Sequence, residues 1–361
     1  PNGIGGLGFN LKWNMGWMND MCHYLKMDPW FRQSNHKDIT FSMFYAFSEN
    51  YILPLSHDEV VHMKGSVRGK MPGDAWAQLA GVRGFYGYTM AHPGKKLSFM
   101  GVELGTEKEW NFEGELDWAV LNNEPNRQLQ QYVRDLNRFY LSESPLWEED
   151  YSWEGFQWLV SDDNQNNVVV FLRRDKAGKE LVCAFNFSPN TYDGYRFGCP
   201  PVKEYVEVFN SDAKVYGGSG AVNAAPCKVS WQESHGQESS VSIRIPPFGA
   251  VFLRGEGKLR AKAKAKAAAE AKEGQEAGGE TRRVAKRAPA AKTALNKAAE
   301  AVTAAAAEKK TTRTRKTAPK QETAEKKPRA SRKTAASEDA AEAAGAPAKK
   351  STRRKTSPEL K

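Results

Sequence analysis

Three ionisable side chains, His57, Asp58 and Glu59, stand in a row directly after the short apolar run 51–55. A run of this length and composition is typical of a buried strand, and apolar residues resume at Val60. An imidazole and two carboxylates are groups that bind ligands or take part in catalysis, and they are costly to place where a buried strand ends. Their purpose depends on the elements that surround them.

Short apolar runs alternate with helical patterns through the first 145 residues. Strands are expected at 7–13, 51–55 and 96–101, and helices at 38–48, 74–91 and 125–140. This alternation favours βαβ units and a parallel sheet, in which ligands bind at the carboxyl ends of the strands. His57, Asp58 and Glu59 would stand at such an end. Pro54 is unusual there, because proline removes a donor from the sheet.

From about residue 150 the pattern changes to short β-rich runs separated by turn-prone stretches. The runs include NVVVFLRR at 167–174, ELVCAFNF at 180–187 and SVSIRI at 240–245, and a typical turn stretch is SDDNQNN at 161–167. This predicts an antiparallel β-sandwich over residues 146–254. A sandwich closes a core of its own, so we expect this domain to fold independently.

The last third of the chain has a different composition. Residues 255–361 contain no aromatic residue and hold 29 Lys and Arg against 13 Asp and Glu, a net charge of +16. Because the whole chain carries +10, residues 1–254 carry −6. Segment 255–361 is expected to be a disordered basic tail, since it has too little apolar surface to offset the entropy of ordering. Such a tail either binds nucleic acid or another polyanion through its charge, or only keeps the protein in solution.

Cysteine usage indicates the compartment. Cys22, Cys183, Cys199 and Cys227 form no CxxC pair and show no metal-ligand spacing, so no metal site is expected. The sequence shows no signal peptide and no apolar stretch of 18 residues. Reduced thiols in a cytoplasmic protein, without a membrane segment, are therefore expected.

Several motifs in order resemble those of one family. GGLGFNLKWNMGWMND (5–20), LPLSHDEVVH (53–62), MPGDAW (71–76) and PGKKLSFMGVELG (93–105), followed by EWN and LDW, are similar to the bacterial 1,4-α-glucan (glycogen) branching enzymes of the α-amylase clan. The resemblance covers residues 1 to about 254. It implies that residues 1–145 are the last three strand–helix units of a (β/α)8 barrel and that 146–254 are the C-terminal all-β domain.

The resemblance also implies roles for particular residues. Members of the family cleave an α-1,4 glucan bond and pass the held segment to a 6-hydroxyl, without a cofactor. Their nucleophile and proton donor follow the fourth and fifth barrel strands, which would precede Pro1, so this chain alone is expected to be inactive. Asp58 corresponds to a third carboxylate that stabilises the transition state, and His57 binds the same sugar. Retaining glycoside chemistry passes through an oxocarbenium-like state that such a carboxylate favours.

Aromatic and acidic residues near the expected strand ends are further candidates for glucan binding. Trp13 and Trp17 would offer platforms for glucose rings, with core packing as the alternative. Glu103 would line the site after the third strand, whereas Trp110 and Trp118 would brace the loop.

The sequence also departs from the family pattern, and other functions remain open. Asn19 stands where His is usual, and Val102 and Leu104 replace Asn and Phe of the usual GNEF motif. One alternative function is a glucan hydrolase of the same clan. Another is a non-catalytic protein that binds glucan or polyanions.

Overall fold

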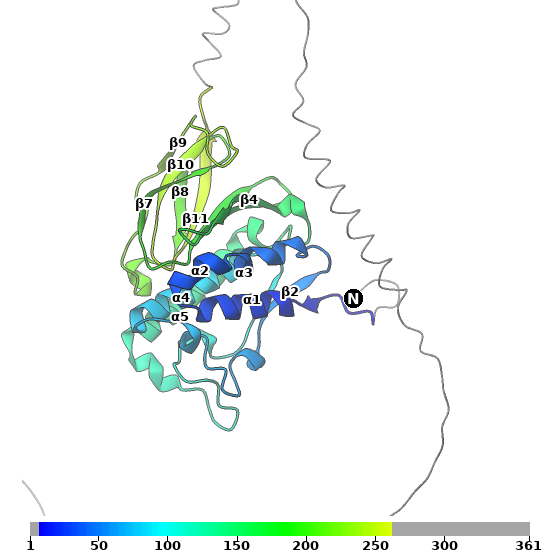
Figure 1. The fold of residues 1–361 in the computed structure, drawn as a ribbon, viewed down its shortest axis with the longest axis vertical. Helices are drawn as coiled ribbons and strands as arrows, with labels where there is room; N and C mark the ends of the chain where they lie inside the picture. The colour runs from blue at the N-terminus through cyan, green and yellow to red at the C-terminus, as the bar shows by residue number, and fades with distance from the viewer. Residues whose placement is uncertain (1–6, 262–361) are drawn as a thin grey trace, which may run out of the picture. The chain divides into compact units, whose positions relative to one another are not determined.

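The computed structural model describes residues 7–261 (Figure 1). The predicted basic tail lies outside the described residues from position 262 onward. The first four residues of the predicted tail, 255–258, instead belong to the last strand, β11 (Ala250–Lys258). This strand pairs with β8 (Val202–Asn210) as far as Lys258, which lies opposite Val202. The folded part therefore extends past the boundary at residue 254 that composition suggested, because backbone pairing continues after the aromatic residues end.

The first half of the described chain contains a small parallel sheet. Strands β1 (Lys12–Trp13), β2 (Tyr51–Leu55) and β3 (Lys95–Ser98) pair in parallel in the order β1-β2-β3. Helices α1 (Met15–Lys26), α2 (Pro29–Arg32) and α3 (Lys37–Thr40) separate the first two strands along the chain, α4 (Ala75–Ala91) separates the next two, and α5 (Glu124–Ser142) follows β3. The parallel sheet predicted from strand–helix alternation is confirmed, and the carboxyl ends of its strands share one edge.

Two predicted elements differ from the structure. The strand expected at 7–13 is reduced to Lys12–Trp13, because β1 pairs on one side only and has no partner for its earlier residues. The single helix expected over 38–48 is wrong. It is a short α3 followed by a 3-10 turn at Phe41–Phe44, whose aromatic rings contact each other and Tyr45 rather than a core.

Residues 156–258 form the predicted all-β part. Its strands are β4 (Phe156–Asp163), β5 (Val168–Arg174), β6 (Glu180–Asn186), β7 (Tyr192–Gly198), β8, β9 (Cys227–Ser230), β10 (Ser240–Ile245) and β11. All their pairings are antiparallel, in the order β4-β5-β6-β11-β8-β9-β10-β7. The antiparallel arrangement predicted from the short β-rich runs is confirmed.

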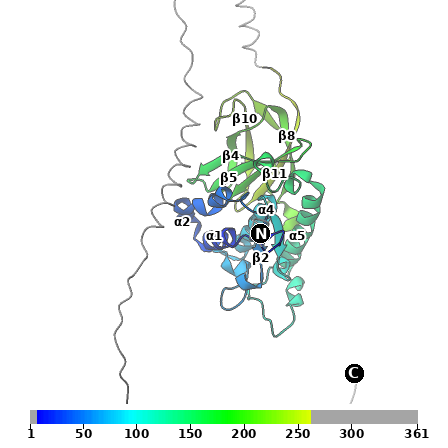
Figure 2. The same ribbon diagram turned by 90° about the vertical axis from the view of Figure 1, so that its right-hand side faces the viewer.

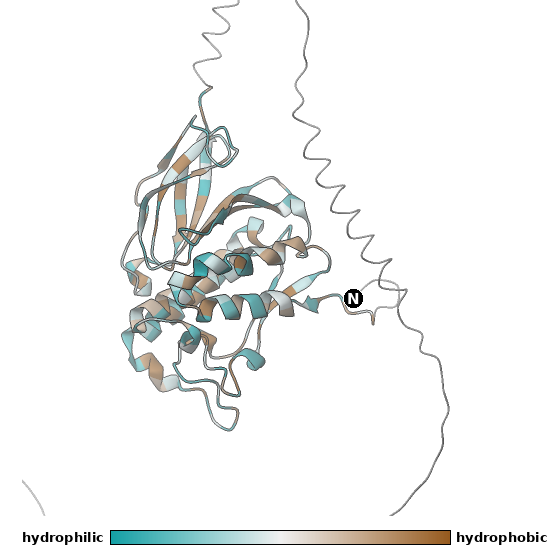
Figure 3. Ribbon diagram, viewed as in Figure 1, coloured by the Kyte–Doolittle hydropathy of each residue, from teal (hydrophilic) through white to brown (hydrophobic). Residues whose placement is uncertain are grey.

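The central strands of this sheet are buried on both faces. Alternate residues of β5, β6 and β11 point in opposite directions, so that Val170 faces the interior of the β-domain while Phe171 faces the helices. Burial on both sides explains why these runs read as almost continuously apolar. Figure 3 shows brown, hydrophobic segments on the strands of the β-domain, among white and teal ones.

Helix α4 lies directly against β11 and the turn before it, as both ribbon views show (Figures 1 and 2). A Cβ atom added to Gly84 would come within 2.2 Å of the Phe248 carbonyl oxygen, and one on Gly87 within 2.5 Å of the Ala250 Cβ. These two glycines allow the close approach of helix and strand. The α/β part and one face of the β-domain thus share a hydrophobic core.

A buried charge network joins the two parts near β3. Asp150 pairs with Arg173 at 2.8 Å, both side chains being fully buried, and with Lys95 at 2.9 Å. Arg173 also donates to the Ala91 carbonyl at the end of α4. Burial by itself would raise the pKa of Asp150, but Lys96, Arg173 and Lys95 outweigh it and lower the pKa. The network fixes the end of α4 and the start of β3 to the β-domain.

Candidate active site

The turn that follows β2 separates its three ionisable residues. The Ser56 hydroxyl accepts a hydrogen bond from the Asp58 N–H at 3.2 Å, and the Glu59 carboxylate accepts from both the N–H (2.6 Å) and the hydroxyl (2.8 Å) of Ser56. This is a capping box on the 3-10 turn His57–Glu59. Glu59 is consequently buried and has a structural role.

Asp58 and His57 point outward from the same turn. Their side chains are 54% and 52% exposed, and the His57 Nε2 lies 3.4 Å from an Asp58 carboxylate oxygen. Asp58 makes no other side-chain hydrogen bond or ion pair within residues 7–261. Its remaining lone pairs are therefore open to a ligand at the carboxyl edge of the sheet.

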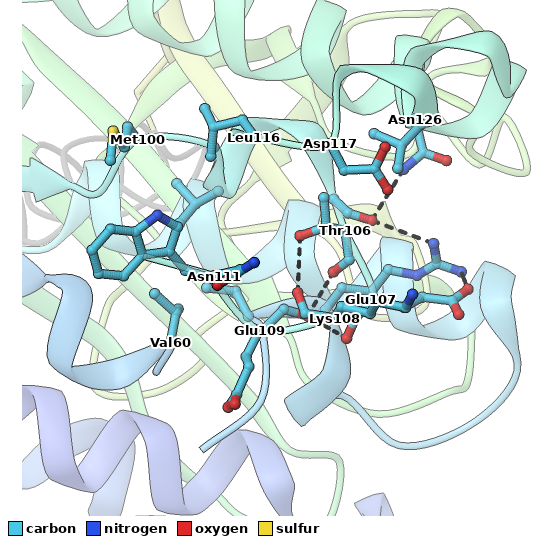
Figure 4. A pocket seen from close by; sticks show the side chains of 18 of the residues that line it. Val60, Met100, Thr106, Glu107, Lys108, Glu109, Asn111, Leu116, Asp117 and Asn126 are labelled. Carbon is cyan, nitrogen blue, oxygen red and sulfur yellow. Dashed lines mark hydrogen bonds and ion pairs between the residues drawn. The ribbon is translucent and has the colours of Figure 1, made fainter. Parts of the chain in front are cut away.

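A cavity of about 460 Å³ lies beside this turn (Figure 4). Its walls are Val60 with residues 66–68, much of the loop 100–117, and residues 120–126 at the start of α5. Trp110 connects the first two walls. Its backbone N–H donates to the Val60 carbonyl at 2.8 Å, and its indole ring lies edge-on to the His57 imidazole with ring centroids 6.5 Å apart. The cavity therefore begins next to the candidate residues.

Part of the polar lining of the cavity is already paired. Asn126 Nδ2 donates to the carbonyls of Leu104 and Gly105 at 2.7 and 3.0 Å, and Arg68 forms an ion pair with Glu107 at 2.9 Å. The carboxylates of Glu115 and Asp117, in contrast, have no hydrogen-bond or ion-pair partner among the described residues. They are acceptors available to a hydroxyl-rich ligand.

The two tryptophans predicted to bind sugar differ in their exposure to solvent. Trp13 ends β1 beside β2 and is 42% exposed, so its ring is accessible. Trp17 is completely buried, 6.2 Å from the Phe85 ring and 6.0 Å from His92. The prediction that Trp17 offers a platform to a sugar is wrong, because the inner face of α1 places its ring in the core.

Glu103 lies near this region but does not line the cavity beside Asp58. It lines a second cavity of about 610 Å³, together with Leu55 and Ser98 at the ends of β2 and β3 and residues of α4 and α5. Tyr86 is close to it, and burial, with a smaller effect of the Glu103 charge, raises the pKa of Tyr86.

Sequence reasoning missed the residues of the loop 100–117 as a group. Trp110 was expected only to brace the loop, and the carboxylates at 115 and 117 were not considered. The signal was a polar and aromatic stretch of about twenty residues between a strand and a helix, which is long for a simple connection. Within residues 7–261 no group of three or more His, Cys, Asp or Glu side chains is arranged to hold a metal ion, and no helix there could cross a membrane.

Comparison with known proteins identifies a matching family model and several similar sequences. The family model of the α-amylase C-terminal all-beta domain matches residues 158–256. The 1,4-alpha-glucan branching enzymes GlgB of Halothermothrix orenii and Aromatoleum aromaticum are each 49% identical, over 257 and 253 residues, which is 70% of this chain and 40% of either relative. The enzyme of Aquifex aeolicus is 49% identical over 261 residues, covering 71% of this chain and 41% of its own. The chain thus spans about 40% of the length of these relatives.

Proposed function

The chain belongs to the family of bacterial 1,4-α-glucan branching enzymes, and we propose that it supplies the Asp58 side of their active site. In the reaction a carboxylate attacks the anomeric carbon of an α-1,4 bond, and the leaving oxygen takes a proton from an acid. A 6-hydroxyl then attacks the covalent intermediate, gives its proton to the conjugate base and forms an α-1,6 branch. The resemblance assigns neither the attacking carboxylate nor the acid to a residue of this chain.

The exposed pair His57 and Asp58 carries this proposal. Asp58 presents its carboxylate at the strand end, where it accepts hydrogen bonds from sugar hydroxyls and stabilises the positive charge of the oxocarbenium-like transition state. His57 donates to the same sugar. Trp110 and the carboxylates of Glu115 and Asp117 line one cavity, and an aromatic ring with hydroxyl acceptors suits further glucose units. Trp13 and Glu103 would contact the glucan from β1 and from the second cavity.

The domain arrangement belongs to the same proposal. We take residues 1–145 as the last three strand–helix units of a (β/α)8 barrel, 146–258, to the end of β11, as the C-terminal all-β domain, and the basic segment that follows as a tail. Three parallel strands with two open edges support this, because a closed barrel of this kind requires eight. The four cysteines are free, in keeping with a cytoplasmic location.

A chimeric enzyme tests the proposed function. Residues 1–261 would be joined to the part of the H. orenii enzyme that the match leaves uncovered, and branching of amylose would be followed by the iodine-stain shift and by release of reducing ends. Branching without reducing ends is expected. Asp58→Asn should lower turnover by several orders of magnitude while the melting curve is preserved, since the charge is lost but the size is kept.

The outcomes separate the alternatives. Release of reducing ends together with the stain shift would favour a hydrolase of the same clan. A chimera that folds and is inactive, or one that is unaffected by Asp58→Asn, would overturn the assignment. The 361-residue chain alone should leave amylose unchanged.

The net charge of +16 on residues 255–361 favours polyanion binding as a second function. A gel shift with double-stranded DNA at two salt concentrations would compare the whole chain with residues 1–261. Binding by the whole chain only, and weaker at higher salt, is expected; equal binding by both would exclude this function.

A further inference from the structure

The loop that leads away from Asp58 has an unfavourable backbone. His62 and Met63 have φ angles of 56° and 67°, in the left-handed region that side chains with a Cβ rarely adopt, and Gly65 has 72°. Their side chains are exposed, with Met63 at 96%, so side-chain burial does not hold them there. Consecutive residues of this kind persist only where the surrounding structure fixes the backbone.

One buried lysine holds this loop from the inside. The Lys70 ammonium donates to three backbone carbonyls, those of Glu59, Lys64 (3.0 Å) and Gly65 (2.8 Å). The first ends the turn that carries Asp58, and the other two end the strained loop. Lys70 therefore connects the two ends of segment 59–65 through a single side chain.

The chemistry of this contact suits a lysine. An ammonium group has three donors and no acceptor, which matches three carbonyl oxygens without leaving a polar atom unpaired. Lys70 is 8% exposed and forms no ion pair with a carboxylate among the described residues. Burial lowers its pKa, and the carbonyl dipoles stabilise the charge that remains. Replacement by an apolar side chain would leave three carbonyls without this donor.

The same segment is fixed from the other side by the loop after β3. Trp110 N–H donates to the Val60 carbonyl at 2.8 Å, and the Gly65 N–H donates to the Glu109 carboxylate at 3.2 Å. Among residues 7–261 the Asp58 carboxylate has no comparable restraint, since its one ion pair is with the half-exposed His57. The position of its carboxylate therefore depends on how firmly the segment behind it is held.

We infer that Lys70 is a positioning residue for Asp58: it fixes the turn and loop 57–65 so that the carboxylate of Asp58 faces the sugar. This inference rests on the branching function proposed above. Misplacement of a catalytic group by about 1 Å can cost on the order of 100-fold in rate. Loss of Lys70 should thus lower kcat rather than weaken glucan binding.

The test uses Lys70→Met and Lys70→Arg, with Lys64→Met as the matched control. Lys64 lies in the same loop, but its side chain is exposed and its ammonium makes no hydrogen bond or ion pair among residues 7–261. In the chimera, Lys70→Met should lower kcat by about 10- to 100-fold with KM changed less than about threefold. Lys70→Arg, which keeps a charged donor group, should restore most of kcat, and Lys64→Met should leave it unchanged.

A second measurement, made on the 361-residue chain, does not depend on enzymatic activity. Hydrogen exchange of the amides of residues 57–65 should become at least tenfold faster in Lys70→Met and stay unchanged in Lys64→Met, while exchange in β5 and β6 is the same in all three proteins. Unchanged exchange in the loop, or a kcat equal to the parent, would overturn the inference. If instead the parent chimera itself does not branch glucan, the proposed function fails and the exchange experiment still decides whether Lys70 holds the loop.

Discussion

At the scale of single residues, adjacent carboxylates at positions 58 and 59 differ because one of them closes a turn. Glu59 uses its carboxylate on Ser56, whereas Asp58 is left half-exposed. The sequence allowed this distinction in part, since Ser56 and Glu59 have the spacing of a capping box. Trp17 shows the limit of such reasoning. Its position after a strand suggested a ligand platform, but Trp17, Met21, Tyr24 and Leu25 recur at helical spacing, which is the pattern of a buried face.

The two carboxylates should therefore respond differently to neutralisation. In the 361-residue chain, Glu59→Gln should lower the free energy of unfolding by about 1–2 kcal/mol, because an uncharged amide oxygen is a weaker acceptor for the two hydrogen bonds that Oε2 accepts, and the amide NH2 would be buried beside it. Asp58→Asn should change it by less than about 0.5 kcal/mol, since within residues 7–261 its half-exposed side chain forms an ion pair only with the half-exposed His57. Urea denaturation of both variants provides the measurement. Equal losses in both variants would show that Glu59 has no special structural role.

At the scale of elements, the hydrophobic periodicity of the sequence predicted where the main strands lie. Strand 51–55 and the antiparallel runs of the β-domain are found where their apolar residues indicated. The pattern did not reveal how α4 meets the β-domain, because this helix is apolar on all sides and its residues do not specify which face meets which neighbour. Gly84 and Gly87 allow that contact, but from sequence alone a glycine within a helix does not indicate close packing.

Two glycine substitutions in α4 would test this packing. Alanine is favoured over glycine in a helix by about 1 kcal/mol, yet Gly84→Ala should destabilise the chain by ~1–3 kcal/mol through overpacking. The new Cβ would meet the backbone oxygen of Phe248, whose own φ of 48° leaves it little freedom to move. Gly81→Ala is the control, because its Cβ would meet only the flexible Met71 side chain, at 3.1 Å from its sulfur. Thermal or urea unfolding that ranks the two variants equally would contradict the close contact of α4 with the turn before β11.

At the scale of the whole molecule, the described part has two hydrophobic cores, but they do not correspond to the two predicted domains. One core lies inside the β-domain and includes Val170, Val182 and Val251. The other lies between its outer face and the helices, where Phe171, Phe185 and Phe252 meet Tyr88 and Phe139. The change to short β-rich runs near residue 150 predicted a domain boundary there, but it could not show that the chain on each side contributes to a common core.

This shared core bears on how independently the β-domain folds. Removal of residues 1–145 would expose the rings of Phe171, Phe185 and Phe252, which are now at most 1% exposed, as one contiguous apolar face. Residues 146–261 expressed alone should therefore bind a hydrophobic dye and unfold at a lower urea concentration than residues 1–261. The interior core remains intact, so unfolding of the fragment should still be cooperative. A fragment with the same midpoint as residues 1–261 and no dye binding would show that the interior core suffices and that the contact with the helices adds no stability.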